Sequence, residues 1–302
     1  MISANIPAPY RDFLRLGTCS WKYDSWKSLL YDENKAYRAD DYLADYARFL
    51  DSVEIDQWFW SLFPDSVKLP DPRVVRRYSE SVPDDFSFTV KAPNAITLTH
   101  FYSQKTSGAS AGKPNAHFLD NELLDEFLVR LKPLGKKLGP IMFQFEYLNK
   151  QKMPSKEAFF ERLKNFILKA PQNHQYAIEI RNPNYLSSPF FDVLKEHGLG
   201  FVYLEGYYMP PIGQVFDRFK PLTAPFSIVR LHGGDRAEIE KETGEVWNRI
   251  VAAKPEALKA AARIARANTR SKVMTYVDVN NHFEGSAPLT IERFLAALSA
   301  EP

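Results

Sequence analysis

Six short segments of β-strand character carry polar side chains at alternate positions, close to the end of each segment. The polar pairs are Glu54 and Asp56, Thr89 and Lys91, Gln144 and Glu146, Glu179 and Arg181, Arg230 and His232, and Asp278 and Asn280. The positions between them are apolar, so each strand has one hydrophobic face and one polar face. An ionised group in a dry core is costly unless it is paired. The recurrence therefore predicts one shared polar cavity.

The residue types in this cavity suit general acid–base chemistry on an anionic or polyhydroxylated small molecule. The basic side chains expected to hold a carboxylate or phosphate are Lys91, Arg181 and Arg230. Arginine is favoured for this contact because its planar guanidinium group can donate two parallel hydrogen bonds. Glu54 or Glu179 is expected to be the general base, and His232 is expected to exchange protons near neutral pH.

Two other interpretations use the same residues. The ionisable groups can instead form a closed ion-pair network that only fills the cavity. A protein that binds a ligand without turning it over needs the same pocket, so the sequence does not separate it from an enzyme.

A divalent metal is a further alternative, although the sequence requires no cofactor. The residues that end four successive strand segments and could bind a metal are Glu179, Glu205, His232 and Asp278. Oxygen ligands with one imidazole suit Mg²⁺, Mn²⁺ or Zn²⁺, and the arrangement is similar to that of xylose isomerase and endonuclease IV, which would make the protein a hydrolase, isomerase or phosphodiesterase. Arg181 and Arg230 occupy the same faces and would repel a cation.

The elements that position these residues alternate along the whole chain. Strand-like segments occupy residues 14–20, 52–56, 86–92, 140–146, 176–181, 199–205, 226–233 and 272–281, and helical patterns occupy 42–50, 72–82, 122–131, 156–169, 189–198, 255–268 and 290–299. Alternating strands and helices predict a parallel sheet with right-handed crossovers. Eight strand segments in this alternation, with a weaker helical signal after the sixth, predict an α/β protein with a single (β/α)₈ TIM-type barrel over residues 1–302 and a barrel core at about 14–299. The polar strand ends would then meet at the rim where barrel enzymes build their sites.

The charge balance argues against a nucleic-acid or membrane partner. The 302 residues include 39 basic and 37 acidic ones, a formal net charge of +2 that gives no general field to gather polyanions. A local basic strip comprises Arg263, Arg266, Arg270 and Lys272. It is expected to be a solvated outer helix face, so nucleic-acid binding is disfavoured and a small-molecule partner is expected.

The cysteine content and the lengths of the apolar segments indicate where in the cell the protein is expected to be. Cys19 is the one cysteine, which excludes an intrachain disulfide and a thiolate metal cluster within one chain. The first residues lack the basic and apolar regions of a signal peptide, and no apolar run reaches the roughly 18–20 residues of a membrane helix. A cytoplasmic protein is the expectation, and the sequence does not indicate an oligomeric state.

Seven segments in order from Gly17 to Pro288 resemble the YecE-like family, known as domain of unknown function 72. They are GTCSWKYDSWKSLLY, YARFLDSVEID, FSFTVKA, LGPIMFQFE, AIEIRNPNY, VRLHG and NNHFEGSAP. Together they span nearly the whole chain. The resemblance implies a TIM-barrel fold and supplies no reaction.

By similarity to this family, fourteen positions are expected to line the pocket. They are Trp21, Tyr23, Trp26, Glu54, Lys91, Thr99, His100, Gln144, Glu179, Arg181, Arg230, His232, Asn280 and Asn281. The three aromatic residues would stack on a flat or apolar face of the substrate, or pack within their own loop.

Two short segments depart from the family pattern. The chain has QWFW at Gln57–Trp60 where the family has a short Ser/Thr–Phe–Tyr turn, which would reshape one pocket wall. It has ITLTH at Ile96–His100 where the family has Ile–Thr–His. Ile96–His100 belongs to the segment 93–118, which we expect to be a long loop or a lid.

Overall fold

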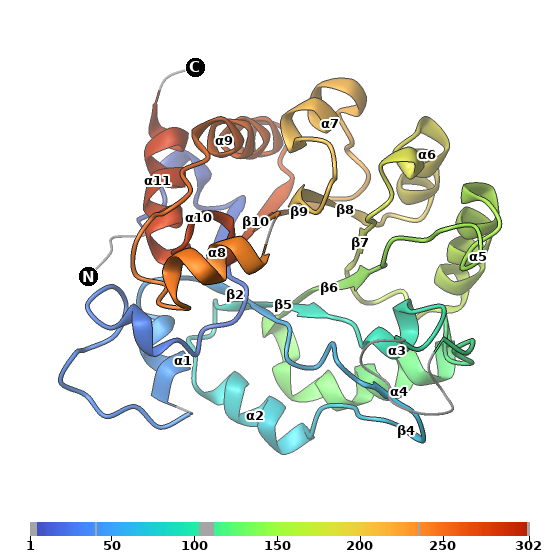
Figure 1. Ribbon diagram of the computed structural model, residues 1–302, viewed down its shortest axis with the longest axis horizontal. Helices are drawn as coiled ribbons and strands as arrows, with labels where there is room; N and C mark the ends of the chain where they lie inside the picture. The colour runs from blue at the N-terminus through green and yellow to red at the C-terminus, as the bar shows by residue number, and fades with distance from the viewer. Residues whose placement is uncertain (1–4, 40, 103–111, 235, 301–302) are drawn as a thin grey trace.

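Eight parallel strands form one sheet in the order β1-β10-β9-β8-β7-β6-β5-β2. Their bounds are β1 Leu14–Thr18, β2 Ser52–Ile55, β5 Ser87–Lys91, β6 Leu138–Gln144, β7 Tyr176–Glu179, β8 Gly200–Gly206, β9 Phe226–Gly233 and β10 Met274–Val279. An isolated parallel bridge between Cys19, directly after β1, and Glu54 of β2 brings the two edges together, so the sheet forms a nearly closed barrel (Figure 1). The predicted TIM-type barrel is confirmed in this computed structural model, which describes residues 5–39, 41–102, 112–234 and 236–300.

A helix follows each strand and covers the outside of the barrel. These helices are α1 Asp41–Tyr46, α2 Pro72–Glu80, α4 Asn121–Leu131, α5 Lys156–Lys169, α6 Ser188–Glu196, α7 Ile212–Phe219, α9 Pro255–Arg270 and α11 Ala287–Ser299. The helix predicted at 156–169 has these bounds, and the Ser155 hydroxyl caps it by accepting from the N–H of Ala158 at 3.1 Å. The helix predicted at 42–50 is shorter, because i→i−3 bonds tighten the chain after Tyr46.

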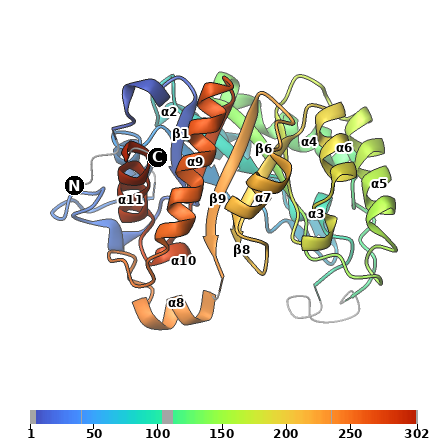
Figure 2. The same ribbon diagram turned by 90° about the horizontal axis from the view of Figure 1, so that it is seen from above.

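Four short elements at the carboxyl ends of the strands were not predicted. They are the β3 Leu62–Phe63 and β4 Ser66–Val67 hairpin, α3 Asn94–Thr97, α8 Arg236–Thr243 and α10 Asn281–Glu284. Figure 2 shows α8 beyond the tip of β9. In α8 only Ile239 and Thr243 are buried, which leaves no helical hydrophobic period in the sequence.

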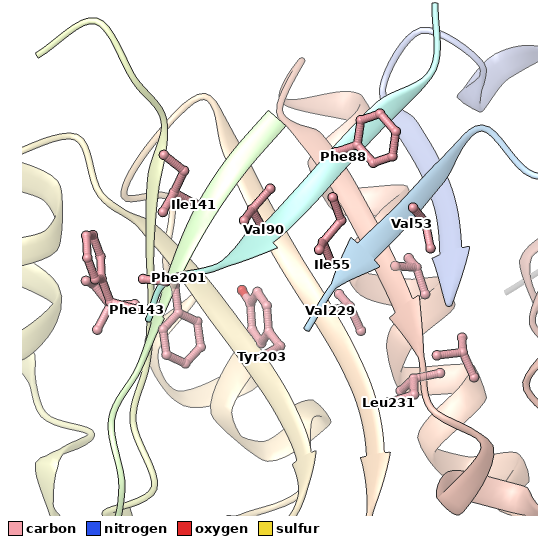
Figure 3. Packing of buried hydrophobic residues seen from close by; sticks show 14 of the residues in the cluster. Val53, Ile55, Phe88, Val90, Ile141, Phe143, Phe201, Tyr203, Val229 and Leu231 are labelled. Atoms are coloured by element: carbon pink, nitrogen blue, oxygen red, sulfur yellow. The ribbon is translucent and has the colours of Figure 1, made fainter. Parts of the chain in front are cut away.

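The alternation along the strands separates two cores. The outward-facing side chains pack under the helices (Figure 3), among them Val53, Ile55, Phe88, Val90, Ile141, Phe143, Phe201, Tyr203, Val229 and Leu231. The inward-facing apolar side chains form a smaller cluster of Met142, Ala177, Val202, Phe226, Ile228 and Tyr276. Since these residues precede the polar positions on their strands, the inner cluster fills the amino-terminal part of the barrel. The polar residues therefore occupy its carboxyl-terminal part.

Gly17 permits the close approach of β1 and β2. A Cβ atom at Gly17 would lie 2.6 Å from the carbonyl oxygen of Ser52, which is backbone and cannot turn aside. We expect Gly17→Ala to lower the free energy of unfolding by about 2 kcal/mol in urea denaturation. Gly234→Ala is the matched control, because a Cβ there meets nothing within 4 Å. Equal losses in the two variants would show that the closure tolerates a side chain.

The two ends of the segment 93–118 pack together. The Asn115 side-chain amide donates to the carbonyl oxygens of Ala95 and Leu98, each at 2.7 Å. Residues 103–111, the centre of the expected loop or lid, lie outside the described residues. Across the four described ranges, no helix combines the length and apolar character that crossing a membrane requires.

Candidate functional site

Arg230 lies at the centre of a buried ion-pair network inside the barrel. Its Nε and Nη2 atoms donate to the two carboxylate oxygens of Glu54 at 2.6 and 2.8 Å, and Nη1 donates to Glu179 at 3.1 Å. These residues come from β9, β2 and β7, which are not neighbours in the sheet. Their side chains therefore meet across the barrel interior, as the alternation in the sequence predicts.

The network holds Arg230 and Glu179 in their charged forms. Burial alone would lower the pKa of Arg230, but the carboxylates of Glu54 and Glu179 raise it well above its usual value. Burial would raise the pKa of Glu179, yet the guanidinium groups of Arg230 and Arg181 hold it below its usual value. Arg230 is only 1% exposed. Its guanidinium group is therefore enclosed by the barrel and bonded to both carboxylates.

Arg181 is the more accessible guanidinium group. Its Nε donates to Glu179 at 3.1 Å, and its side chain keeps 19% of its surface exposed. The guanidinium carbon lies 3.9 Å from the ring centroid of Tyr207, a cation–π contact that orients the planar group. Within the described part of the chain, its terminal nitrogens Nη1 and Nη2 make no hydrogen bond. They are donors that a bound anion could use.

Lys91 is a second uncommitted cationic group. It ends β5, is 7% exposed, and holds its Nζ 4.0 Å from the ring centroid of Phe59. Among the described residues it has neither a hydrogen bond nor an ion pair. Burial, aided by the charge of Arg230, lowers the pKa of Lys91 to about 8, although Glu54, Glu179 and Asp56 act in the opposite direction.

Asp278 lies next to Arg230 in the register of β10 and β9, and it differs from the other acids. One of its oxygens accepts from the Thr89 hydroxyl at 2.9 Å, and the other has no hydrogen-bond partner in the described structure. Burial and the charge of Glu54 raise the pKa of Asp278 to about 8, so its carboxyl group is largely neutral at pH 7. Burial also raises the pKa of the Cys19 thiol nearby, which makes that thiol a poor nucleophile.

His232 sits beside the Arg181 contact. Its Nε2 lies 3.4 Å from the Tyr207 hydroxyl, and the two rings are 4.6 Å apart. Burial, together with the charges of Arg230, Arg181 and Lys91, lowers the pKa of His232 well below its usual value. The imidazole is therefore neutral at pH 7. Tyr207 and Tyr208 both have left-handed backbone, with φ of 53° and 62°, which is a strained turn for two aromatic residues.

Gln144, Thr99 and His100 occupy the next part of the rim. The Gln144 carbonyl oxygen lies 3.5 Å from Arg230 Nη1, at the edge of the central network. Thr99 forms a separate cluster, in which its hydroxyl lies 3.4 Å from Glu146 and 3.0 Å from His100 Nδ1.

The aromatic and asparagine residues of the first and last loops pack against one another. The Trp26 indole donates at 3.2 Å to the Asn281 carbonyl oxygen, which also accepts from the N–H of Ala287. Asn280 caps α10 by accepting from the N–H of His282 at 2.9 Å. Trp21 and Trp26 are fully buried, and the partly exposed Tyr23 packs on Trp26 at 4.7 Å between centroids. In this structure Trp21, Tyr23 and Trp26 therefore pack against the protein itself.

The structure does not bring the four metal-candidate residues together. Glu205 and its neighbour Leu204 lie on opposite faces of β8. The Glu205 carboxylate accepts a hydrogen bond from the N–H of Ile212, at the start of α7, at 2.9 Å. In the part of the chain that the structure describes, no three His, Cys, Asp or Glu side chains form a group that could hold a metal ion.

The basic strip of α9 is partly committed to contacts within the molecule. Arg263 pairs with Asp217 at 2.8 Å, and Arg266 donates to the carbonyl oxygens of Ala297 and Leu298 at 3.1 Å. Figure 1 places α9 on the outside of the barrel. These residues therefore lie apart from the network around Arg230.

Two contributors to the site were not predicted by the sequence. Tyr207 lies in a Tyr- and Pro-rich segment without a clear pattern, and Phe59 belongs to the QWFW segment that departs from the family. Tyr102 is a third aromatic residue at this rim: burial and the charge of Glu146 raise its pKa to about 12, against the opposing charge of Arg181.

The comparisons with known proteins agree with this architecture. A family model described as "Protein of unknown function DUF72" matches residues 15–302. UPF0759 protein YecE from Escherichia coli strain K12 is 24% identical over 251 residues, which cover 77% of this chain and 78% of that protein.

Solved structures of two other proteins have the same fold. A DUF72 family protein from Thermotoga maritima MSB8 has 22% identity and a TM-score of 0.65, and the match covers 95% of this chain and all of that one. A DUF72 family protein from Enterococcus faecalis V583 has 18% identity and a TM-score of 0.64, with 96% of each chain covered.

Proposed function

The chain belongs to the DUF72 family, and from that premise we propose that it is an enzyme which binds a small anionic or polyhydroxylated molecule at the carboxyl-end rim of its barrel. One observation carries the proposal: Lys91 and Arg181 present free donors beside a network in which Arg230 is already neutralised. A buried cation without a partner is costly, and a bound anion would offset that cost. The rim is thus built to be completed by a carboxylate or phosphate.

The acid–base roles follow from the environment of each group. Glu54 and Glu179 are held by guanidinium groups, so their part is to position Arg230 and Arg181. Lys91 has a pKa of about 8, close to the pH at which it would work, which suits a group that gives and takes protons. His232 is a neutral imidazole near Arg181, and because burial and the neighbouring cations lower its pKa well below the usual value, it would accept a hydrogen bond from a bound molecule rather than a proton.

Arg181→Met should weaken anion binding. We expect inorganic phosphate to raise the melting temperature of the wild type, and the variant to need about tenfold more phosphate for the same shift, since one charge-assisted contact of about 1.5 kcal/mol is lost. Arg218→Met is the matched control, because Arg218 also lies over an aromatic ring, that of Phe219 at 4.9 Å, but on the exposed face of α7.

The control should behave like the wild type. If phosphate shifts all three proteins equally, or shifts none, the rim does not bind anions and the proposal fails.

Turnover separates an enzyme from a ligand-binding protein. The wild type is incubated with a mixture of metabolites that carry carboxylate or phosphate groups, and substrates and products are followed by mass spectrometry. Consumption by the wild type but not by Lys91→Met supports an enzyme. A metabolite that stabilises the protein and is never consumed identifies a binding protein instead.

A further inference from the structure

We propose that Lys91 forms a covalent imine with the carbonyl carbon of an aldehyde or ketone that also carries a carboxylate or phosphate. The anionic group of this molecule is held by the terminal nitrogens of Arg181. The inference rests on the proposed function, because it names the substrate class of the same rim.

The position of Lys91 favours this role. The residue ends β5 on the inward face of the barrel. Thr89, two residues earlier on the same face, donates a hydrogen bond to the buried Asp278. Its chain is enclosed, and its Nζ lies over Phe59 rather than over a carboxylate. A lysine that served only to balance charge would be expected to pair with Glu54 or Glu179, yet both are bonded to arginines.

The surroundings also keep part of the Lys91 amine unprotonated. Burial and the charge of Arg230 lower its pKa, and the carboxylates of Glu54, Glu179 and Asp56 oppose them without restoring the usual value. With a pKa of about 8, about a tenth of the amine is neutral at pH 7, compared with less than about a thousandth for an ordinary lysine. Desolvation beside another cation is a known way to activate a lysine nucleophile.

The covalent step balances without an oxidant or reductant. The amine lone pair attacks the carbonyl carbon, the C=O π electrons move to oxygen, and one amine proton passes to that oxygen to give a carbinolamine. The hydroxyl group then takes a proton supplied by the solvent and leaves as water, while nitrogen forms the C=N bond. The resulting protonated imine withdraws electrons and weakens the adjacent C–H or C–C bond.

Reductive trapping tests the inference on the unmodified protein. The wild type is treated near pH 7 with glyoxylate and sodium cyanoborohydride, which converts an imine to a stable secondary amine, and labelled lysines are mapped by tandem mass spectrometry. We expect Lys91 to be labelled about tenfold faster than the exposed Lys68. Labelling of Lys91 no faster than Lys68 would overturn the inference, whatever its variants do.

A neutral aldehyde allows the imine and the anion site to be tested independently. Acetaldehyde is used in parallel, and the ratio of Lys91 to Lys68 labelling removes the intrinsic difference between the reagents. The ratio should be several-fold higher with glyoxylate in the wild type and should fall to the acetaldehyde value in Arg181→Met. A high ratio that is equal for both aldehydes in the wild type supports the imine and contradicts the proposed anion site.

Two variants control for position and folding. Lys91→Met should lose only the Lys91 adduct, while Lys68→Arg should leave Lys91 labelling unchanged. If the wild type is stabilised by phosphate through Arg181 yet gives no Lys91 adduct, the proposed function stands and the imine is rejected.

Discussion

Arg230→Met is expected to lower the free energy of unfolding by about 4 kcal/mol near pH 8. Methionine fills much of the space but leaves Glu54 and Glu179 buried without the donor they share, at distances of 2.6 to 3.1 Å in the wild type. The loss is measured by urea denaturation, with circular dichroism to verify the native fold. Arg263→Met is the control: its pair with Asp217 is exposed, so it should cost less than about 1 kcal/mol.

The loss of unfolding free energy caused by Arg230→Met, here called the deficit, should depend on pH. Without the Arg230 guanidinium group, burial is expected to raise the pKa of Glu179 in the folded variant above its value in the unfolded chain. The unfolded chain then loses protons first as the pH increases, so the variant loses stability between the unfolded and the folded pKa. The deficit should therefore be smaller near pH 5 than near pH 8, and Glu54→Gln in the same chain should recover part of it. A deficit that is independent of pH would mean that lost packing, not unpaired charge, is the cause.

Asp278→Asn is expected to remove a large pH dependence of stability. In the wild type, burial and Glu54 raise the Asp278 pKa from 3.8 to about 8 in the folded protein. The unfolded chain loses this proton near pH 4, whereas the folded protein keeps it up to about pH 8. The free energy of unfolding therefore falls as the pH rises from about 4 to 8, and the destabilisation is largest above about pH 8. A difference of about four between the two pKa values corresponds to an effect on the order of 5 kcal/mol, so near pH 8 the variant should be at least as stable as the wild type.

Unfolding curves collected across this pH range test the Asp278 prediction. The advantage of the variant over the wild type should shrink as the pH falls from about 8 and should be lost below about pH 3, where the wild-type carboxyl group is protonated in both the folded and the unfolded state. Asp217→Asn, at an exposed position on α7, provides the comparison and should follow the wild type closely. A constant difference at every pH would show that Asp278 is ionised in the folded protein.

The meeting of Glu54, Glu179 and Arg230 could be predicted from the sequence because parallel strands end at one rim. Each strand has a period of two, so the apolar partners Ile55, Ile178 and Val229 fix which face turns inward. That pattern predicts the barrel and the meeting of these three polar side chains inside it, and the structure shows both. The same parity also explains Glu205: on β8 the inward face is apolar, with Leu204 next to Arg230 in register, so Glu205 points outward.

Other features depend on distances that no local pattern contains. Whether Arg230 faces a ligand or closes on two carboxylates is set by the width of the barrel between β9, β2 and β7. The position of Tyr207 under Arg181 requires two aromatic residues in left-handed backbone, which sequence preferences disfavour. The burial of Trp26 depends on Asn281, 255 residues away in the chain.

A crystal structure of the protein soaked in phosphate would test the central claim most directly. We predict a phosphate within hydrogen-bonding distance of Arg181 Nη1 or Nη2 and of Lys91 Nζ, with Arg230 still bonded to Glu54 and Glu179. Phosphate bound only elsewhere on the surface, with Lys91 turned to pair with a carboxylate of the barrel, would contradict it.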